Sequence, residues 1–120
     1  SFGEDLNHQQ LASYCLVNEH QELLAFGQYY QRLGYCHLGR LVVNPKHRGK
    51  GLAQLLINRL AKQGCQQLGL NSLSLFVLAD NRPALSVYQK LGFIETRYPE
   101  QIPLANCRYM VLEQAQWPNE

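Results

Sequence analysis

The chain has 120 residues, of which 46% are hydrophobic and 17% are charged. This composition can bury one core of ordinary domain size and is not that of a disordered chain, so we expect a single domain over residues 1–120. No apolar run approaches the ~20 residues of a membrane-spanning helix, and the composition also excludes collagen and coiled coil. Residues 1–5 lack the basic and apolar stretches of a secretion signal, which favours a cytoplasmic location.

The formal net charge of +2 is unevenly distributed along the chain. Residues 1–22 sum to −4, residues 23–79 sum to +7 with no acidic residue, and residues 80–120 sum to −1. A central block without carboxylates suggests an anionic partner. A solvated basic face explains the block equally well. Nucleic acid is a third interpretation, but the basic residues lack the interleaved aromatic side chains that favour single-strand binding.

The four cysteines are too sparse for a disulfide-stabilised fold, and with the scattered histidines they form no metal-ligand spacing. Each cysteine lies in or beside an apolar stretch, so we expect buried free thiols in a reducing compartment and no metal. They are Cys15, Cys36, Cys65 and Cys107.

The first part of the chain is rich in branched and aromatic residues broken by short polar turns. This pattern predicts strands over residues 12–18, 23–33 and 35–43. Because the turns between them are short, the three strands should form an antiparallel meander. Pro45 ends the third strand, since proline cannot donate to a strand ladder.

A helical period begins at Gly51, with a helix expected to end between Gly64 and Gly69. Its apolar face is predicted from Leu52, Leu55, Leu56, Leu60 and Ala61. A buried strand over residues 73–79 follows.

Asn81 is a good N-cap for a second helix, which should stop at Gly92. Strands over residues 93–98 and 107–113 complete a mixed α/β sheet.

Residues 43–53 carry the chemistry, because a strand ends there, a basic loop follows and an amphipathic helix begins. No Ser, Thr, Asp or Asn stands at the expected N-cap, so the first amides of the helix need another acceptor. Gly49 and Gly51 allow close approach of a ligand to the backbone. With Arg48 and Lys50 they form a candidate phosphate-binding turn. Neither the P-loop nor the dinucleotide-binding pattern is present, and a tight turn that needs glycine only for its geometry is the alternative.

This segment resembles the acyl-CoA signature R-x-x-G-x-G/A of the GCN5-related N-acetyltransferase (GNAT) family, with Arg48, Gly51 and Ala53 at its defined positions. Residues 81–93 resemble the family's N-x-x-A-x-x-x-Y-x-K-x-G-F pattern. The resemblance covers roughly residues 12–114, and two blocks in the right order are jointly specific. It implies a mixed, mostly antiparallel sheet with a splayed parallel strand pair, flanking helices and N-terminal helices that are short or missing.

The resemblance also implies a function, an acetyl-CoA-dependent N-acetyltransferase that moves the acetyl group to a primary amine in a ternary complex. Tyr88 would protonate the departing thiolate, although the spacing of Ala84, Tyr88 and Leu91 equally suits a core aromatic. The alternative to a coenzyme contact is a helix cap for Asn81 and a solvated helix residue for Lys90. The implied coenzyme contacts are Leu41, Val42, Val43, Arg48, Gly49, Lys50, Gly51, Leu52, Ala53, Asn81, Ala84 and Lys90.

Two features depart from the family pattern. The strand over residues 35–43 has no carboxylate, so His37 is its only candidate base, and a packed or surface histidine is the alternative. Water-mediated deprotonation involving the distant Glu19, Glu22 or Glu95 is another route, and no base is assigned. Only residues 1–11 precede the first strand, so either the sequence is truncated or the acceptor site is unusually open. A second subunit could complete an open site as a homodimer, or the site could admit a protein amine. The alternative functions are a non-catalytic acyl-CoA sensor and a nucleic-acid-binding module.

Overall fold

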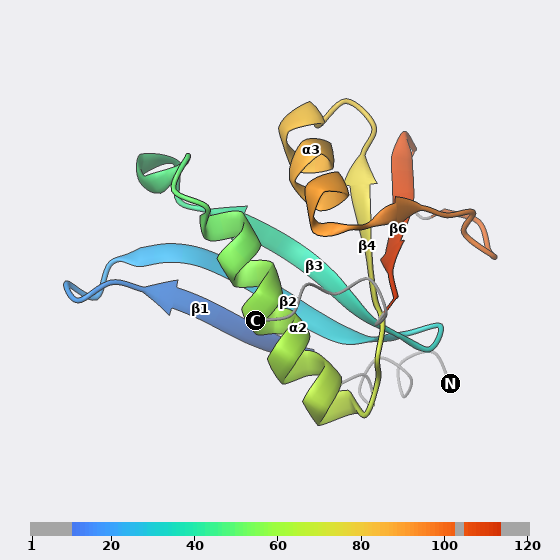
Figure 1. Ribbon diagram of the computed structural model, residues 1–120, viewed down its shortest axis with the longest axis horizontal. Coiled ribbons are helices and arrows are strands. Elements are labelled where there is room, and N and C mark those ends of the chain that lie inside the picture. The colour runs from blue at the N-terminus through green and yellow to red at the C-terminus, as the bar shows by residue number, and fades with distance from the viewer. Residues whose placement is uncertain (1–10, 103–104, 114–120) are drawn as a thin grey trace.

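The computed structural model describes residues 11–102 and 105–113 of the chain. Within them a sheet of six strands has the order β1-β2-β3-β4-β6-β5 and is accompanied by two helices (Figure 1). The elements in chain order are β1 (Ala12–Val17), β2 (Leu23–Arg32), β3 (Tyr35–Val43), the short 3-10 helix η1 (Pro45–His47), α2 (Leu52–Leu68), β4 (Leu73–Leu78), α3 (Arg82–Leu91), β5 (Ile94–Glu95) and β6 (Cys107–Leu112). The predicted mixed, mostly antiparallel sheet is confirmed. The expected shortening of the N-terminal helices concerns residues outside the described ones.

Every strand pair is antiparallel except β3 with β4. These two strands are joined through α2, and a helical crossover is the usual connection between parallel neighbours. Their pairing covers only residues 36–38 against 73–75. Both strands continue beyond the paired stretch, so the parallel pair is splayed, as the family resemblance implied.

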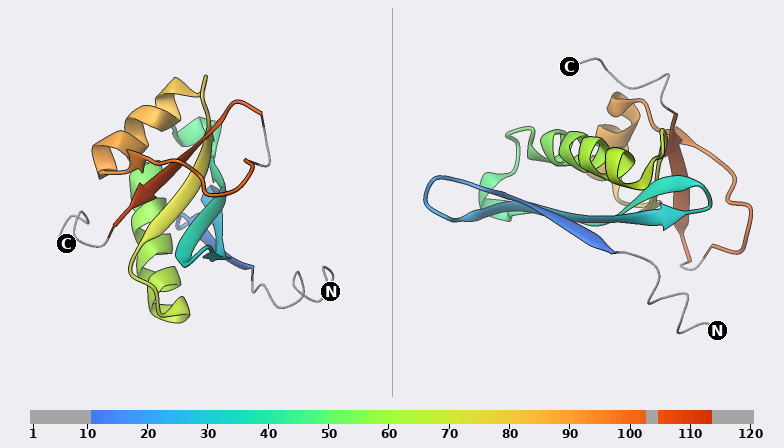
Figure 2. Two further views of the ribbon diagram at one scale, coloured as in Figure 1. Left: turned by 90° about the vertical axis from the view of Figure 1, so that its right-hand side faces the viewer. Right: turned by 90° about the horizontal axis from the view of Figure 1, so that it is seen from below.

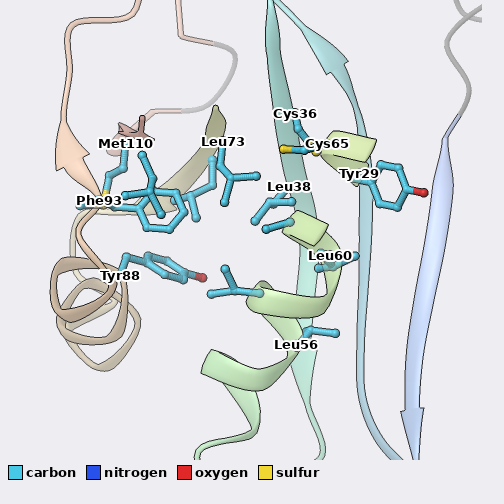
Figure 3. Packing of buried hydrophobic residues seen from close by; sticks show 14 of the residues in the cluster. Tyr29, Cys36, Leu38, Leu56, Leu60, Cys65, Leu73, Tyr88, Phe93 and Met110 are labelled. Atoms are coloured by element: carbon cyan, nitrogen blue, oxygen red, sulfur yellow. The ribbon is translucent and has the colours of Figure 1, made fainter. Parts of the chain in front are cut away.

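Both helices lie on the same side of the sheet (Figure 2). Helix α2 crosses strands β1 to β3, α3 lies beside β4 and β6, and the two helices share one hydrophobic core (Figure 3). The largest apolar side chains that are almost completely buried in that core are Tyr29, Cys36, Leu38, Leu56, Ile57, Leu60, Leu73, Leu75 and Met110. A smaller aromatic cluster lies on the other face of β4 and β6 and contains Phe76, Tyr98 and Tyr109. In the described part of the chain, no helix is both long and apolar enough to cross a membrane.

The apolar face of α2 is rotated slightly from the predicted one. Leu55 is 39% exposed, whereas Ile57, which the prediction omitted, is buried. Gly64 continues the buried stripe because a β-carbon there would meet the Cys36 sulfur at 2.7 Å and the Tyr29 ring at 3.0 Å. The helix therefore needs a glycine at this close approach to the sheet, and it ends at Leu68 with Gly69 as its C-cap, within the predicted interval.

The predicted length of β5 and the predicted burial of the cysteines also need correction. Strand β5 has two residues instead of the predicted six, because its ladder with β6 pairs only Ile94 and Glu95, and β6 lies between β4 and β5 in the sheet. The cysteines are free, but only Cys36 and Cys65 are buried. Cys15 is exposed because alternation along β1 turns it to the face opposite α2, and Cys107 is half-buried.

Candidate active site

The splayed strand pair creates the first part of the site. After Leu38, strand β3 pairs with β2 alone, since the structure gives no β4 partner to residues 39–43. A bulge accompanies the divergence, because the β2 partner shifts between Gly39 and Val42 and Arg40 has a positive φ of 51°. Bulges bend a strand and increase its twist. The edge of β3 that faces the splay can therefore offer backbone groups to an extended ligand.

A turn between β3 and α2 forms the second part. The Asn44 side chain fixes its start, since Nδ2 donates to the Leu23 carbonyl at 2.8 Å and Oδ1 accepts from the Lys46 amide at 3.0 Å. Gly49 and Gly51 have φ values of 81° and 72°, and no atom lies within 4 Å of a β-carbon built at either position. The turn thus needs glycine for its backbone conformation and leaves open space above it.

The start of α2 is uncapped, as the sequence predicted. Gly51 occupies the N-cap and no side chain accepts from the first amides. The first intrahelical donor is the Leu55 amide, which bonds to the Gly51 carbonyl at 3.1 Å. The preceding amides and the positive end of the helix dipole are therefore available to an anion.

Helix α3 brings Tyr88 to the site. The Asn81 side chain caps this helix by accepting from the Ala84 amide at 3.3 Å, which confirms its predicted structural role. Tyr88 is 9% exposed, and its hydroxyl points from α3 toward α2 (Figure 3). Burial raises the pKa of Tyr88 above the ordinary tyrosine value of 10.0, so the hydroxyl keeps its proton near neutral pH.

These parts enclose a cavity of about 500 Å³, which is a normal size for a small-molecule site. Among the described residues, Arg48 is the only charged side chain that lines it, and no carboxylate does so. The lining combines an apolar wall with a basic, amide-rich end. It comprises Leu41, Val43, Arg48, Gly49, Gly51, Leu52, Ala53, Gln54, Leu56, Ile57, Asn81, Pro83, Ala84, Val87 and Tyr88.

Ten of the thirteen predicted site residues line this cavity. The exceptions are Val42, whose side chain is 54% exposed, and Lys50 and Lys90, which are exposed on the turn and in the last turn of α3. The sequence interpretation missed five lining residues: Gln54, Leu56, Ile57, Pro83 and Val87. Helical spacing offered a signal for Val87, which lies three residues after Ala84.

His37 is packed outside this cavity. It is 3% exposed, and its Nδ1 lies 2.8 Å from the Ser74 hydroxyl. The Phe76 and Tyr30 rings flank it at centroid distances of 4.9 and 5.3 Å. Burial, with a smaller contribution from the charge of Arg32, lowers the pKa of His37 to about 4. The ring is therefore neutral at pH 7 and belongs to the aromatic side of the sheet.

The donor set of the cavity suits a coenzyme A thioester. Free amides and Arg48 match a pyrophosphate, the apolar wall matches a pantetheine chain, and the buried Tyr88 hydroxyl can donate a proton. Among residues 11–102 and 105–113, no group of His, Cys, Asp and Glu side chains could hold a metal ion. A splayed sheet with a glycine-bordered, uncapped helix start at its opening is the arrangement of acyl-CoA-binding transferase folds.

Comparison with known proteins places the chain within that class. The model of the Acetyltransferase (GNAT) family matches residues 2–93. The chain belongs to this family, which confirms the resemblance seen in the sequence.

Two curated relatives show the extent of the similarity. The spermidine N(1)-acetyltransferase of Vibrio cholerae is 33% identical over 80 residues, covering 64% of this chain and 46% of its own length. An uncharacterised N-acetyltransferase of Schizosaccharomyces pombe is 36% identical over 80 residues, and the match covers 67% of this chain and 48% of that protein. The chain thus spans about half the length of these relatives.

Solved structures agree with the fold. A Klebsiella pneumoniae protein described as an acyl-CoA N-acyltransferase superposes with a TM-score of 0.77 at 18% identity, covering 87% of this chain and 72% of its own. The dodecameric spermidine N-acetyltransferase of Vibrio cholerae superposes with a TM-score of 0.73 at 20% identity, and the match covers 96% of this chain and 71% of that one. At such identities these likenesses concern the fold.

Proposed function

We propose that this chain is an acetyl-CoA-dependent N-acetyltransferase that transfers the acetyl group directly to a primary amine. The observation that carries the proposal is the uncapped, glycine-bordered start of α2, which opens into the same cavity as the Tyr88 hydroxyl. Residues 1–120 would form its single domain. Membership of the GNAT family supports the reaction class.

The chain's own groups have distinct roles in this proposal. Arg48, Lys50 and the amides of residues 49–53 bind the pyrophosphate, and the β3 edge at residues 41–43 pairs with the pantetheine. A β3 amide near Val42 stabilises the negative charge that develops on the thioester oxygen. Asn81, Ala84 and Lys90 border the coenzyme from α3.

The transfer itself needs a neutral amine and a proton donor. The amine nitrogen bonds to the acetyl carbon, the carbon–sulfur bond breaks, and Tyr88 gives its proton to the departing sulfur. The amine loses a proton in the same sequence, which returns the tyrosinate to its neutral form or passes to water. No side chain of the described residues is assigned as the base.

Ligand-dependent thermal unfolding tests the proposal. Acetyl-CoA should raise the melting temperature, while ATP and a mixed oligonucleotide should not, because a ligand that binds only the folded state stabilises it. Stabilisation by the oligonucleotide alone would instead support a nucleic-acid module.

A thiol-release assay over a panel of amines separates an enzyme from an acyl-CoA sensor. Spermidine is a suitable first acceptor, because a curated relative is a spermidine N(1)-acetyltransferase. Release of free coenzyme A that requires the amine supports transfer; binding without release over the whole panel supports a sensor.

Two further expectations belong with this proposal. A similar structure is dodecameric, and we expect this chain to assemble at least as a homodimer, which light scattering measures directly. A cytoplasmic location is part of the proposal, since the proposed reaction draws on intracellular acetyl-CoA.

A further inference from the structure

The turn between β1 and β2 contacts the candidate phosphate-binding turn through the side chains of Glu22 and His47. His47 Nε2, in η1, lies 3.2 Å from Glu22 Oε1. The His47 side chain is 18% exposed and that of Glu22 38%. The Nε2 atom is buried without a well-aligned hydrogen-bond partner among the described residues, so the Glu22 carboxylate is the group that compensates it.

The other ring nitrogen of His47 faces the candidate phosphate contact. Lys50 Nζ lies 3.4 Å from His47 Nδ1. An ammonium has only donors, so this contact requires Nδ1 as the acceptor and leaves the proton of a neutral ring on Nε2, toward Glu22. Carboxylate, imidazole and ammonium therefore form a chain from Glu22 through His47 to Lys50.

Asn18 orients the Glu22 end of this chain. Asn18 Nδ2 donates to Glu22 Oε1 at 3.2 Å, and Asn18 Oδ1 accepts from the Glu22 amide at 3.0 Å. The hydrogen-bonding contact with His47, helped by the Asn18 bond and the charge of Lys46, lowers the pKa of Glu22. The carboxylate is thus charged and oriented before any ligand arrives.

We propose that Glu22 and His47 are positioning residues that hold the Lys50 ammonium in place for the coenzyme pyrophosphate. Lys50 stands between Gly49 and Gly51, the two residues of the turn with positive φ, and a lysine side chain has four rotatable bonds to immobilise on binding. Glu22 fixes the His47 ring, and the Nδ1 acceptor of that ring restrains the Lys50 side chain before the ligand binds. Part of the entropy cost of binding is thereby removed in advance. The inference rests on the proposed function, because the ligand that Lys50 meets is the coenzyme.

The test is a double-mutant cycle on the dissociation constant of coenzyme A, measured by calorimetry with the full chain. Glu22→Ala should raise that constant about three- to tenfold, the range of one partly exposed charged hydrogen bond. Glu22→Gln keeps an acceptor oxygen and should recover part of the loss. Lys50→Met should weaken binding by itself, and Glu22→Ala added to it should have no further effect, because Glu22 acts through Lys50.

Glu19→Ala is the matched control. It removes the same charge from the same turn, but Glu19 is 86% exposed and its nearby ionisable partner is the equally exposed His20. Binding of coenzyme A should stay unchanged in this variant. With a working acceptor, Glu22→Ala should raise KM for acetyl-CoA and leave kcat near its original value, which a general loss of folding would not do.

The outcomes separate the two proposals. If the wild-type chain and Glu22→Ala bind coenzyme A equally well, the positioning role is wrong and the proposed function stands. The same conclusion follows if Glu22→Ala lowers the affinity as much in the Lys50→Met background as in the wild type. If the wild-type chain binds no coenzyme A, the proposed function is wrong and the positioning role falls with it.

Discussion

Tyr88 satisfies two requirements at one position. Its ring packs against Phe93, with centroids 5.9 Å apart, while its hydroxyl belongs to the cavity lining. Sequence spacing could show only the first role, because a helical stripe of Ala84, Tyr88 and Leu91 is also what a plain core requires. The hydroxyl, unlike the ring, contributes little to packing, and its removal can therefore isolate the chemical role.

Replacing Tyr88 with phenylalanine should lower kcat about 100-fold or more, the usual contribution of a positioned general acid. The melting temperature should change little, since the ring volume is kept. Steady-state kinetics with a working amine and thermal unfolding of the same preparation measure both effects. Because burial raises the pKa of Tyr88, the wild-type rate should not decline from loss of this proton until the pH exceeds the ordinary tyrosine range.

Tyr29→Phe is the control for this experiment. Tyr29 is also a buried tyrosine, but its hydroxyl bonds to Gln63 and Gln67 on α2, at a distance from the cavity lining. This variant should lose some stability and keep kcat. Equal kcat values in Tyr88→Phe and the wild type would reduce Tyr88 to a core aromatic.

The two ends of α2 allow a test at the scale of a whole element. Gly51 and Gly69 flank the helix with nearly equal φ values of 72° and 69°, and a β-carbon at either position meets no atom within 4 Å. Alanine at either position should cost about 1 kcal/mol of folding free energy, because L-residues are strained in the left-handed region. Urea unfolding measures that cost.

Only Gly51→Ala should also weaken binding of coenzyme A, since its methyl group would stand where the backbone meets the phosphates. Gly69→Ala controls for strain, as it changes the same backbone conformation at the opposite end. A similar loss of affinity in both variants, after correction for the unfolded fraction, would mean that the start of α2 is not the phosphate site.

The sequence predicted those elements whose signals are local. Gly51 without a capping side chain, Asn81 before Pro83, and Gly92 after the last turn each mark a helix end through backbone chemistry. The insertion of β6 between β4 and β5 had no such signal, because strand order depends on contacts between distant segments. The bulge at Arg40 was equally hidden, since a positive φ at arginine is set by the surrounding sheet.

At the scale of the whole molecule, the sheet separates two environments. The face toward α2 and α3 holds the large core and the candidate site, whereas the opposite face of β3 and β4 holds an aromatic cluster with His37 and Ser74. Arg32 lies over the Phe76 ring at 5.3 Å and donates to the Tyr98 and Tyr30 hydroxyls at 2.9 Å. This cluster ties the loop after β5 to the central strands, so it serves the stability of the molecule.

The buried His37 makes that stability depend on pH. Its pKa falls from 6.5 to about 4 on folding, so the unfolded chain binds more protons between these values and acidification favours unfolding. The free energy of unfolding should therefore fall by about 2 kcal/mol from pH 7 to pH 5. Glu22, whose pKa is also lowered, loses its contribution to stability only below its ordinary pKa of 4.5.

Urea unfolding between pH 7 and pH 5 should show this decline of the unfolding free energy in the wild type and in His20→Gln, because the His20 side chain is 80% exposed. It should be nearly absent in His37→Phe, even if that variant is less stable at every pH; an unchanged slope there would assign the titration to another group.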